Sequence, residues 1–172
     1  MKHIALWIFI GIAGRLIMHL PDATPLTSLC VLSPVYFSKR LSVFIMLITV
    51  MLSDFALHRL MHYPLFGLWT VFTYSGWLGV IFLGVFLAKK MTVPRALYFS
   101  CSGALLFWIW TNFGTWITTT IYPHSFSGFM MCYVAALPFL RNSVIASVVW
   151  TGVIVWVASP RVLKRMYADM LQ

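Results

Sequence analysis

The feature that most constrains this fold is a series of long apolar segments with almost no charge. Of the 172 residues, apolar types make up 62% and charged types 9%. Roughly 20 apolar residues in a helix are enough to cross about 30 Å of hydrocarbon. The segments do not alternate apolar with polar residues, as the strands of a membrane barrel do. The sequence therefore predicts an all-α, polytopic membrane protein.

We expect six transmembrane helices in a single domain that covers residues 1–172. Apart from a short amphipathic tail after the last one, they are predicted over residues 4–20, 26–37, 41–57, 65–88, 96–117 and 143–158. A short apolar piece at 128–137 is expected to stop at Pro138 and Arg141-Asn142. No small-residue cleavage site lies near Pro21, so the first segment is interpreted as a retained helix and not as a signal peptide.

The basic residues indicate how the helices are oriented. A formal net charge of +9 can indicate a nucleic-acid partner, but these residues lie at segment ends and not on one face, so no nucleic acid is expected. With six spans, one side holds both termini and nine of the twelve Lys and Arg: Lys2, Lys39, Arg40, Lys89, Lys90, Arg95, Arg161, Lys164 and Arg165. The positive-inside rule places that side in the cytoplasm, which predicts a multi-pass protein of the bacterial inner membrane.

Three polar stretches, 19–25, 53–64 and 111–142, are then expected to share the outward side. Asp54 is the only acidic residue within an apolar span, and such a carboxylate needs a partner. Arg15 or Arg141 could supply it. A purely structural ion pair and a contact to a ligand are equal interpretations of Asp54.

We expect the three stretches to build one ligand site. Asp54 and Arg141 would orient polar ligand groups, while Trp116 and Tyr133 would stack on a ring. The loop at 21–25 would act as a gate. The full set of candidate ligand-binding residues is Arg15, His19, Asp22, Thr24, Asp54, Asn112, Trp116, Tyr122, His124, Tyr133, Arg141 and Asn142. For Tyr122 a place in an interfacial aromatic belt is an equal alternative.

Catalysis and metal binding find little support in the sequence. No nucleophile elbow, phosphate-binding glycine loop or pair of carboxylates is present, so no enzyme and no cofactor is expected. His58 and His62 are four residues apart, but no glutamate of a zinc-binding motif lies between them. The three cysteines form no metal-binding spacing and are interpreted as small apolar residues. The outward cavity therefore favours a mostly neutral, ring-containing solute.

Three motifs resemble a family of small bacterial membrane proteins. They are RLIMHLPDATPLTSL from Arg15, LSDFAL from Leu52, and TNFGTW with the later CYVAALPFLRN from Thr111 onward. That family is related to the substrate-binding S components of energy-coupling-factor (ECF) vitamin transporters. The resemblance implies six helices with both termini inside, and uptake of a vitamin or related micronutrient, for example of cobalamin type. The ligand would lie at the outward side, under the loops picked out above.

The resemblance also implies partners. S components work with an energising module, EcfT and its ATPases, whereas BtuM-like cobalamin transporters work alone. The Ala-x-x-x-Ala docking signature is absent from residues 4–20, where Gly11 and Gly14 could replace it. The cobalt-binding cysteine of BtuM-like proteins has no equivalent near 74–77, although His124 or His62 could serve as a cobalt ligand. Two alternatives remain: an accessory subunit of a larger membrane complex, and a haem- or quinone-binding redox protein.

Overall fold

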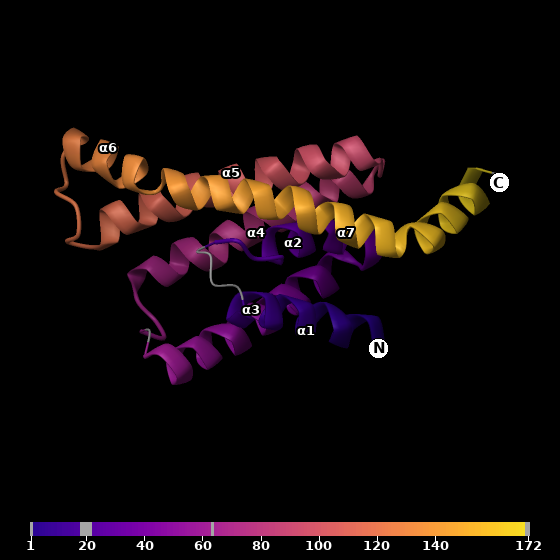
Figure 1. Cartoon of the computed structure of the whole chain (residues 1–172), viewed down its shortest axis with the longest axis horizontal. Helices are drawn as coiled ribbons and strands as arrows, with labels where there is room; N and C mark the ends of the chain where they lie inside the picture. Colours follow the sequence, from indigo (N-terminus) through magenta and orange to yellow (C-terminus); the bar gives the residue numbers. More distant parts are fainter. Residues whose placement is uncertain (1, 18–21, 63, 171–172) are drawn as a thin grey trace.

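In the part of the chain that the structure describes, every regular element is a helix, as the sequence predicted (Figure 1). The computed structural model describes residues 2–17, 22–62 and 64–170, and the side chains among them from Ile4 to Ala158. The helices are α1 (Lys2–Ile17), α2 (Leu26–Tyr36), α3 (Lys39–Met61), α4 (Leu68–Ala88), α5 (Val93–Thr118), α6 (Phe126–Ala135) and α7 (Leu137–Met170).

The core lies where α2 packs against α4, α5 and α7. Val31 of α2 and Val80 of α4 are completely buried there, together with Leu87. Close packing of α2 on α4 depends on Gly84, because a Cβ at this position would meet the backbone carbonyl of Val31. α2, which is only 11 residues long, is thus enclosed by longer helices.

α1 is peripheral and packs mainly against α3, with a smaller contact to α2. Gly11 allows the approach, since an added Cβ would meet the Thr49 methyl group. Gly14 does the same against the ring of Pro25, just before α2. Gly11 and Gly14, considered above as a replacement for the docking signature, thus let α1 pack closely on α3 and on the start of α2.

Two of the connections between helices lie at the end of the bundle opposite the chain ends. In Figure 1 the α3–α4 and α5–α6 connections lie at the left, and both chain ends lie at the right. Ser38, Thr92 and Ser125 cap α3, α5 and α6 with side-chain hydroxyls that accept backbone N–H bonds. The sequence predicted that these two loops would share a side, and the fold brings them to one end.

Several helix boundaries differ from the prediction by two or three residues, and two differ by a turn or more. α3 extends to Met61, one turn beyond the predicted end, so Asp54 lies two turns from its carboxyl end. α7 starts at Leu137 and not at 143, and it runs without a break past Ala158. Pro138 was taken as the end of an apolar piece, but it occupies the second position of α7. A proline is tolerated there because the first-turn N–H groups have no partner within the helix.

Among the described residues, three helices are long and apolar enough to cross a membrane: Lys39–Met61, Leu68–Ala88 and Leu137–Ala158. Shorter apolar helices cover Ile4–Ile17, Leu26–Tyr36 and Phe126–Ala135. The all-α architecture and these three helices fit a helical membrane protein.

Candidate functional site

An ion pair joins α1 to α3 in the half of the bundle that carries the loops. Arg15 Nη1 lies 2.6 Å from Asp54 Oδ1 and donates a second bond of 2.6 Å to Ser53 Oγ. The Ser53 hydroxyl donates in turn to the Thr49 carbonyl at 2.7 Å. The sequence offered Arg15 or Arg141 as partners for Asp54, and the structure selects Arg15.

Tyr74 brings α4 into the same cluster. Its hydroxyl donates to Asp54 Oδ2 at 3.2 Å, so both carboxylate oxygens of Asp54 accept a bond. We call Arg15, Ser53, Asp54 and Tyr74 the ionic cluster. It connects three helices, and its charged side chains are only 20% (Arg15) and 16% (Asp54) exposed. A pair buried to this extent is a functional candidate by default within an apolar bundle.

The ionic cluster keeps unused hydrogen-bonding capacity. Only Nη1 of Arg15 is engaged, and among the described residues its Nε and Nη2 groups have no acceptor. A guanidinium has five N–H donors, so three remain available. Sequence analysis missed Ser53 and Tyr74 as members. Two sequence features could have identified them: Ser53 is adjacent to Asp54, and Tyr74 belongs to a polar group within an apolar helix.

A second cluster lies on α5 and α6 and is aromatic. Trp116 contacts His124 and Phe129 edge-on, at centroid distances of 5.9 and 5.3 Å. Phe129 contacts Tyr133 at 4.6 Å, and Tyr133 contacts Trp108 at 5.1 Å. We call these five residues the aromatic hairpin cluster, because they hold α6 against the end of α5.

The polar atoms of the aromatic hairpin cluster bond to nearby backbone carbonyls. Trp116 Nε1 donates to Pro123 O at 3.0 Å, and His124 Nε2 lies 3.2 Å from Thr119 O. Trp108 Nε1 donates to Ala136 O and Tyr133 Oη to Ile109 O, both at 2.8 Å. These bonds close the turn between α5 and α6 and the break between α6 and α7. The predicted ring-stacking side chains are therefore engaged within the protein.

Asn112 belongs to the same region. The side-chain Nδ2 of Asn112 donates to Trp108 O at 2.8 Å, within α5. The backbone carbonyl of Asn112 lies 3.5 Å from Cys132 Sγ of α6. Cys132 is buried, as predicted for a small apolar residue. Asn112 thus supports the packing of α6 on α5.

The remaining predicted residues lie around the ends of α2, α5 and α7. Asp22 has a left-handed backbone (φ 60°), and its carbonyl accepts a bond of 3.3 Å from Ser143 Oγ of α7. Thr24 and Tyr122 are half-buried, and Arg141 is exposed in the second turn of α7. Asn142 lies in the same turn and is engaged in an interaction. His19 lies outside the described residues.

The structure thus divides the predicted site. Arg15 and Asp54 come together, and so do Asn112, Trp116, His124 and Tyr133. In the described part of the chain, no hydrogen bond, ion pair or ring contact joins one group to the other. α4 packs against both α3 and α5, and it separates the groups. Tyr74 reaches Asp54, while Phe72 contacts Trp110 of α5 at 5.2 Å.

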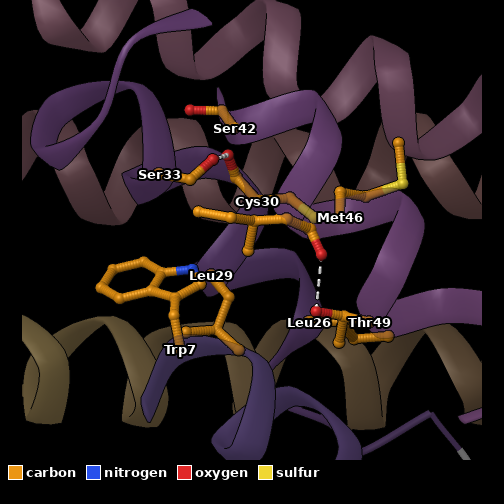
Figure 2. Close-up of a pocket in the computed structure, with 9 residues that line it drawn as sticks. Trp7, Leu26, Leu29, Cys30, Ser33, Ser42, Met46 and Thr49 are labelled. Atoms are coloured by element: carbon orange, nitrogen blue, oxygen red, sulfur yellow. Dashed lines mark hydrogen bonds between the residues drawn. The ribbon is translucent and has the colours of Figure 1, made fainter. Parts of the chain in front are cut away.

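A cavity lies elsewhere, between α1, α2 and α3. Figure 2 shows Trp7 and Leu29 on one side of it and Ser33, Ser42 and Met46 on the other. Its volume of about 10 Å³ is close to what a single water molecule needs. The Ser33 and Thr49 hydroxyls bond to carbonyls of their own helices. The cavity is therefore a small packing defect beside α1 and not a solute site.

Metal ligands do not gather in the described residues. No group of three His, Cys, Asp or Glu side chains among them could hold a metal ion. The two histidines that were considered together, His58 and His62, do not share a helical face. α3 ends at Met61, and His62 has a left-handed backbone with φ 56°.

Fold and cluster together define a class: a small, all-helical protein of membrane-spanning composition, with a partly buried ion pair near its loop end. The chain belongs to a family of unknown function, DUF6580, whose model matches residues 1–168. No curated protein gave a significant match. No solved structure matches the chain either.

Proposed function

We propose that this chain is a substrate-binding membrane protein of the ECF S-component type, which takes up a vitamin or related micronutrient. Six helices would cross the bacterial inner membrane, with both termini in the cytoplasm. The concentration of Lys and Arg on the side of the termini supports this orientation. The position of the α3–α4 and α5–α6 connections, opposite the chain ends, supports a common outward face (Figure 1).

The single observation that carries the proposal is the ionic cluster. A charged pair in an apolar bundle is expensive to desolvate, and replacing it by apolar residues is often neutral or stabilising. Stability alone therefore does not explain the pair of Arg15 and Asp54. Arg15 also offers three N–H donors that no described residue accepts. These donors and the Asp54 carboxylate suit a solute with both acceptors and donors at its polar end.

Arg15 has a position from which a solute contact could affect the rest of the protein. α1 packs on α3 and α2 alone among the described helices, and the ionic cluster is its polar link to α3 and α4. A solute that rearranged this link would alter how α1 sits on the bundle. Reorientation of the helical body, with or without an energising module, would then complete transport.

Native mass spectrometry of the full chain in a maltoside detergent tests the proposal. We expect a bound vitamin-like compound at about one molecule per chain, identified after its release. The proposal would be wrong if the protein carried a stoichiometric protein partner and remained free of small solutes after incubation with the common water-soluble vitamins. A visible haem absorbance band would contradict it in another way, since it would indicate a redox protein.

A further inference from the structure

Three cations surround the turn that joins α4 to α5. Lys89 and Lys90 follow the last residue of α4, and Arg95 lies in the first turn of α5. Both lysines are exposed, whereas Arg95 is half-buried. We call these three residues the basic turn. It lies at the end of the bundle that holds the chain ends, opposite the α3–α4 and α5–α6 connections (Figure 1).

Arg95 is engaged within the turn itself. Its Nε donates to Lys90 O at 2.9 Å, and its Nη2 donates to Phe86 O at 3.3 Å. Its guanidinium lies 5.5 Å from the ring centroid of Phe99. The last carbonyls of a helix carry partial negative charge, which a nearby cation stabilises. Arg95 supplies that cation at the end of α4, so the two lysines are not needed for it.

No acidic partner balances the two lysines among the side chains that the structure describes. The ion pair found there joins Arg15 to Asp54, and Asp22 lies in the α1–α2 connection. Lys39 and Arg40, which are exposed at the start of α3, add two positive charges at the same end of the bundle (Figure 1). This end of the molecule is therefore complementary in charge to an anion.

An apolar stripe on α4 leads directly to the basic turn. Leu78, Phe82 and Phe86 are spaced four residues apart and share one face of the helix, where they are 44%, 61% and 39% exposed. Lys89 Nζ lies 5.1 Å from the ring centroid of Phe86, so the stripe ends at a cation. α4 is long and apolar enough to cross a membrane, and its exposed stripe would then face hydrocarbon.

We propose that the basic turn and the stripe bind an anionic phospholipid. The phosphate would lie at Lys89 and Lys90, and an acyl chain would lie along Phe82 and Phe86. Clusters of basic residues beside a membrane-spanning helix attract anionic lipids. A phospholipid combines an anion with an apolar chain, and so matches both parts of this surface. An acidic protein segment or a free phosphate would match the charges alone. Lipid binding here requires neither a solute nor transport.

Thermal unfolding of the full chain in maltoside detergent tests the inference. Phosphatidylglycerol or phosphatidylcholine with the same acyl chains is added in mixed micelles. We expect phosphatidylglycerol to raise Tm in a saturable way, and phosphatidylcholine to raise it much less. The double variant Lys89→Gln with Lys90→Gln should need about 30-fold more phosphatidylglycerol for half of the effect, because each lysine contributes about fivefold. Without added lipid its Tm should match that of the wild type, since both lysines are exposed.

Arg59→Gln is the matched control. Arg59 is exposed and lies 5.6 Å from the ring centroid of Phe55, much as Lys89 lies over Phe86, but it belongs to α3. This variant should keep the wild-type response to phosphatidylglycerol. Inorganic phosphate, added at constant ionic strength, should leave Tm unchanged.

Three results would overturn the inference. The first is an equal rise in Tm with the two lipids, and the second is a response to phosphatidylglycerol that the double variant retains in full. The third is a rise in Tm with inorganic phosphate as large as that with phosphatidylglycerol, which would indicate an anion site that makes no use of the apolar stripe.

Discussion

The ionic cluster and the aromatic hairpin cluster use polar atoms in opposite ways. In the aromatic hairpin cluster, indole and phenol groups donate to carbonyls between 7 and 28 residues away, all on α5, α6 or the segments beside them. In the ionic cluster, Arg15 bonds to residues 38 and 39 positions away on another helix. The first set closes a hairpin, and the second joins helices that are distant in sequence.

The two clusters also differ in how many hydrogen-bond donors they leave without an acceptor. Trp108, Trp116 and Tyr133 have their donors satisfied by backbone carbonyls, so a ligand would have to displace an existing bond. Arg15 has three N–H groups that no described residue accepts. A partly buried charge with spare donors is what a binding site needs, and a satisfied aromatic cluster is what a rigid scaffold needs. The proposed function therefore uses the ionic cluster for binding, and the aromatic hairpin cluster supports the loop end.

The largest expected effect comes from breaking the ion pair. Asp54→Ala removes the carboxylate that forms the ion pair with the partly buried Arg15, which should destabilise the protein by about 3 kcal/mol. Denaturant unfolding in detergent measures the change. Arg15→Met combined with Asp54→Leu should recover most of the loss, and Arg141→Ala, for which the described residues show no ion pair, is the control. An Asp54→Ala variant as stable as Arg141→Ala would contradict this assignment.

The next effect concerns the approach of α1 to α3. Gly11→Ala would place a methyl group against Thr49 and push the helices apart, at a cost of about 1–3 kcal/mol. Because Arg15 follows one turn later, the ion pair should weaken as well. Gly152→Ala is the matched control: a Cβ there meets nothing within 4 Å, so this variant should gain up to about 1 kcal/mol from helix propensity. If the two alanine variants had equal stabilities, α1 would not be packed as described.

A third prediction concerns the aromatic hairpin cluster. Trp108→Phe removes the donor to Ala136 O and should destabilise the protein by about 1–2 kcal/mol. Hydrogen exchange should become faster locally, at the amides of α6 and the break before α7. Solute binding should be retained. Loss of solute with unchanged exchange in α6 would move the binding site to this cluster.

The smallest effect is expected at the edge of the ionic cluster. Tyr74→Phe removes one bond to Asp54 and leaves the Arg15 bond in place, so the loss of stability should be about 1 kcal/mol. The affinity for the solute should fall, because Asp54 is held less firmly. Thr73→Val is the control, since the hydroxyl of Thr73 bonds within α4. A Tyr74→Phe variant that matches Thr73→Val in affinity would exclude Tyr74 from the site.

Much of the fold could be predicted because apolar segments of this length have few alternatives. The helices, their approximate order and the need of Asp54 for an arginine all follow from the cost of buried polar groups. The position of Pro138 did not, because a proline can either end a helix or begin one. Only the bonds at Ala136 show that the chain restarts as α7 at once.

The separation of the predicted site into two clusters could not be predicted either, and the reason is a different one. Charge patterns indicate on which side of a membrane a residue lies, but not which helix stands between two residues. Asp54 and Trp116 were grouped because their loops share an end, and α4 separates them.

The most direct test of the central claim compares the bound solute in three preparations of the full chain: wild type, Asp54→Asn and Trp116→Phe. Both substitutions conserve shape, so mass spectrometry of the released solute reports on binding. The account predicts about one solute per chain in wild type and in Trp116→Phe, and a strongly reduced amount in Asp54→Asn. Retention in Asp54→Asn together with loss in Trp116→Phe would contradict it and place the site on α5 and α6.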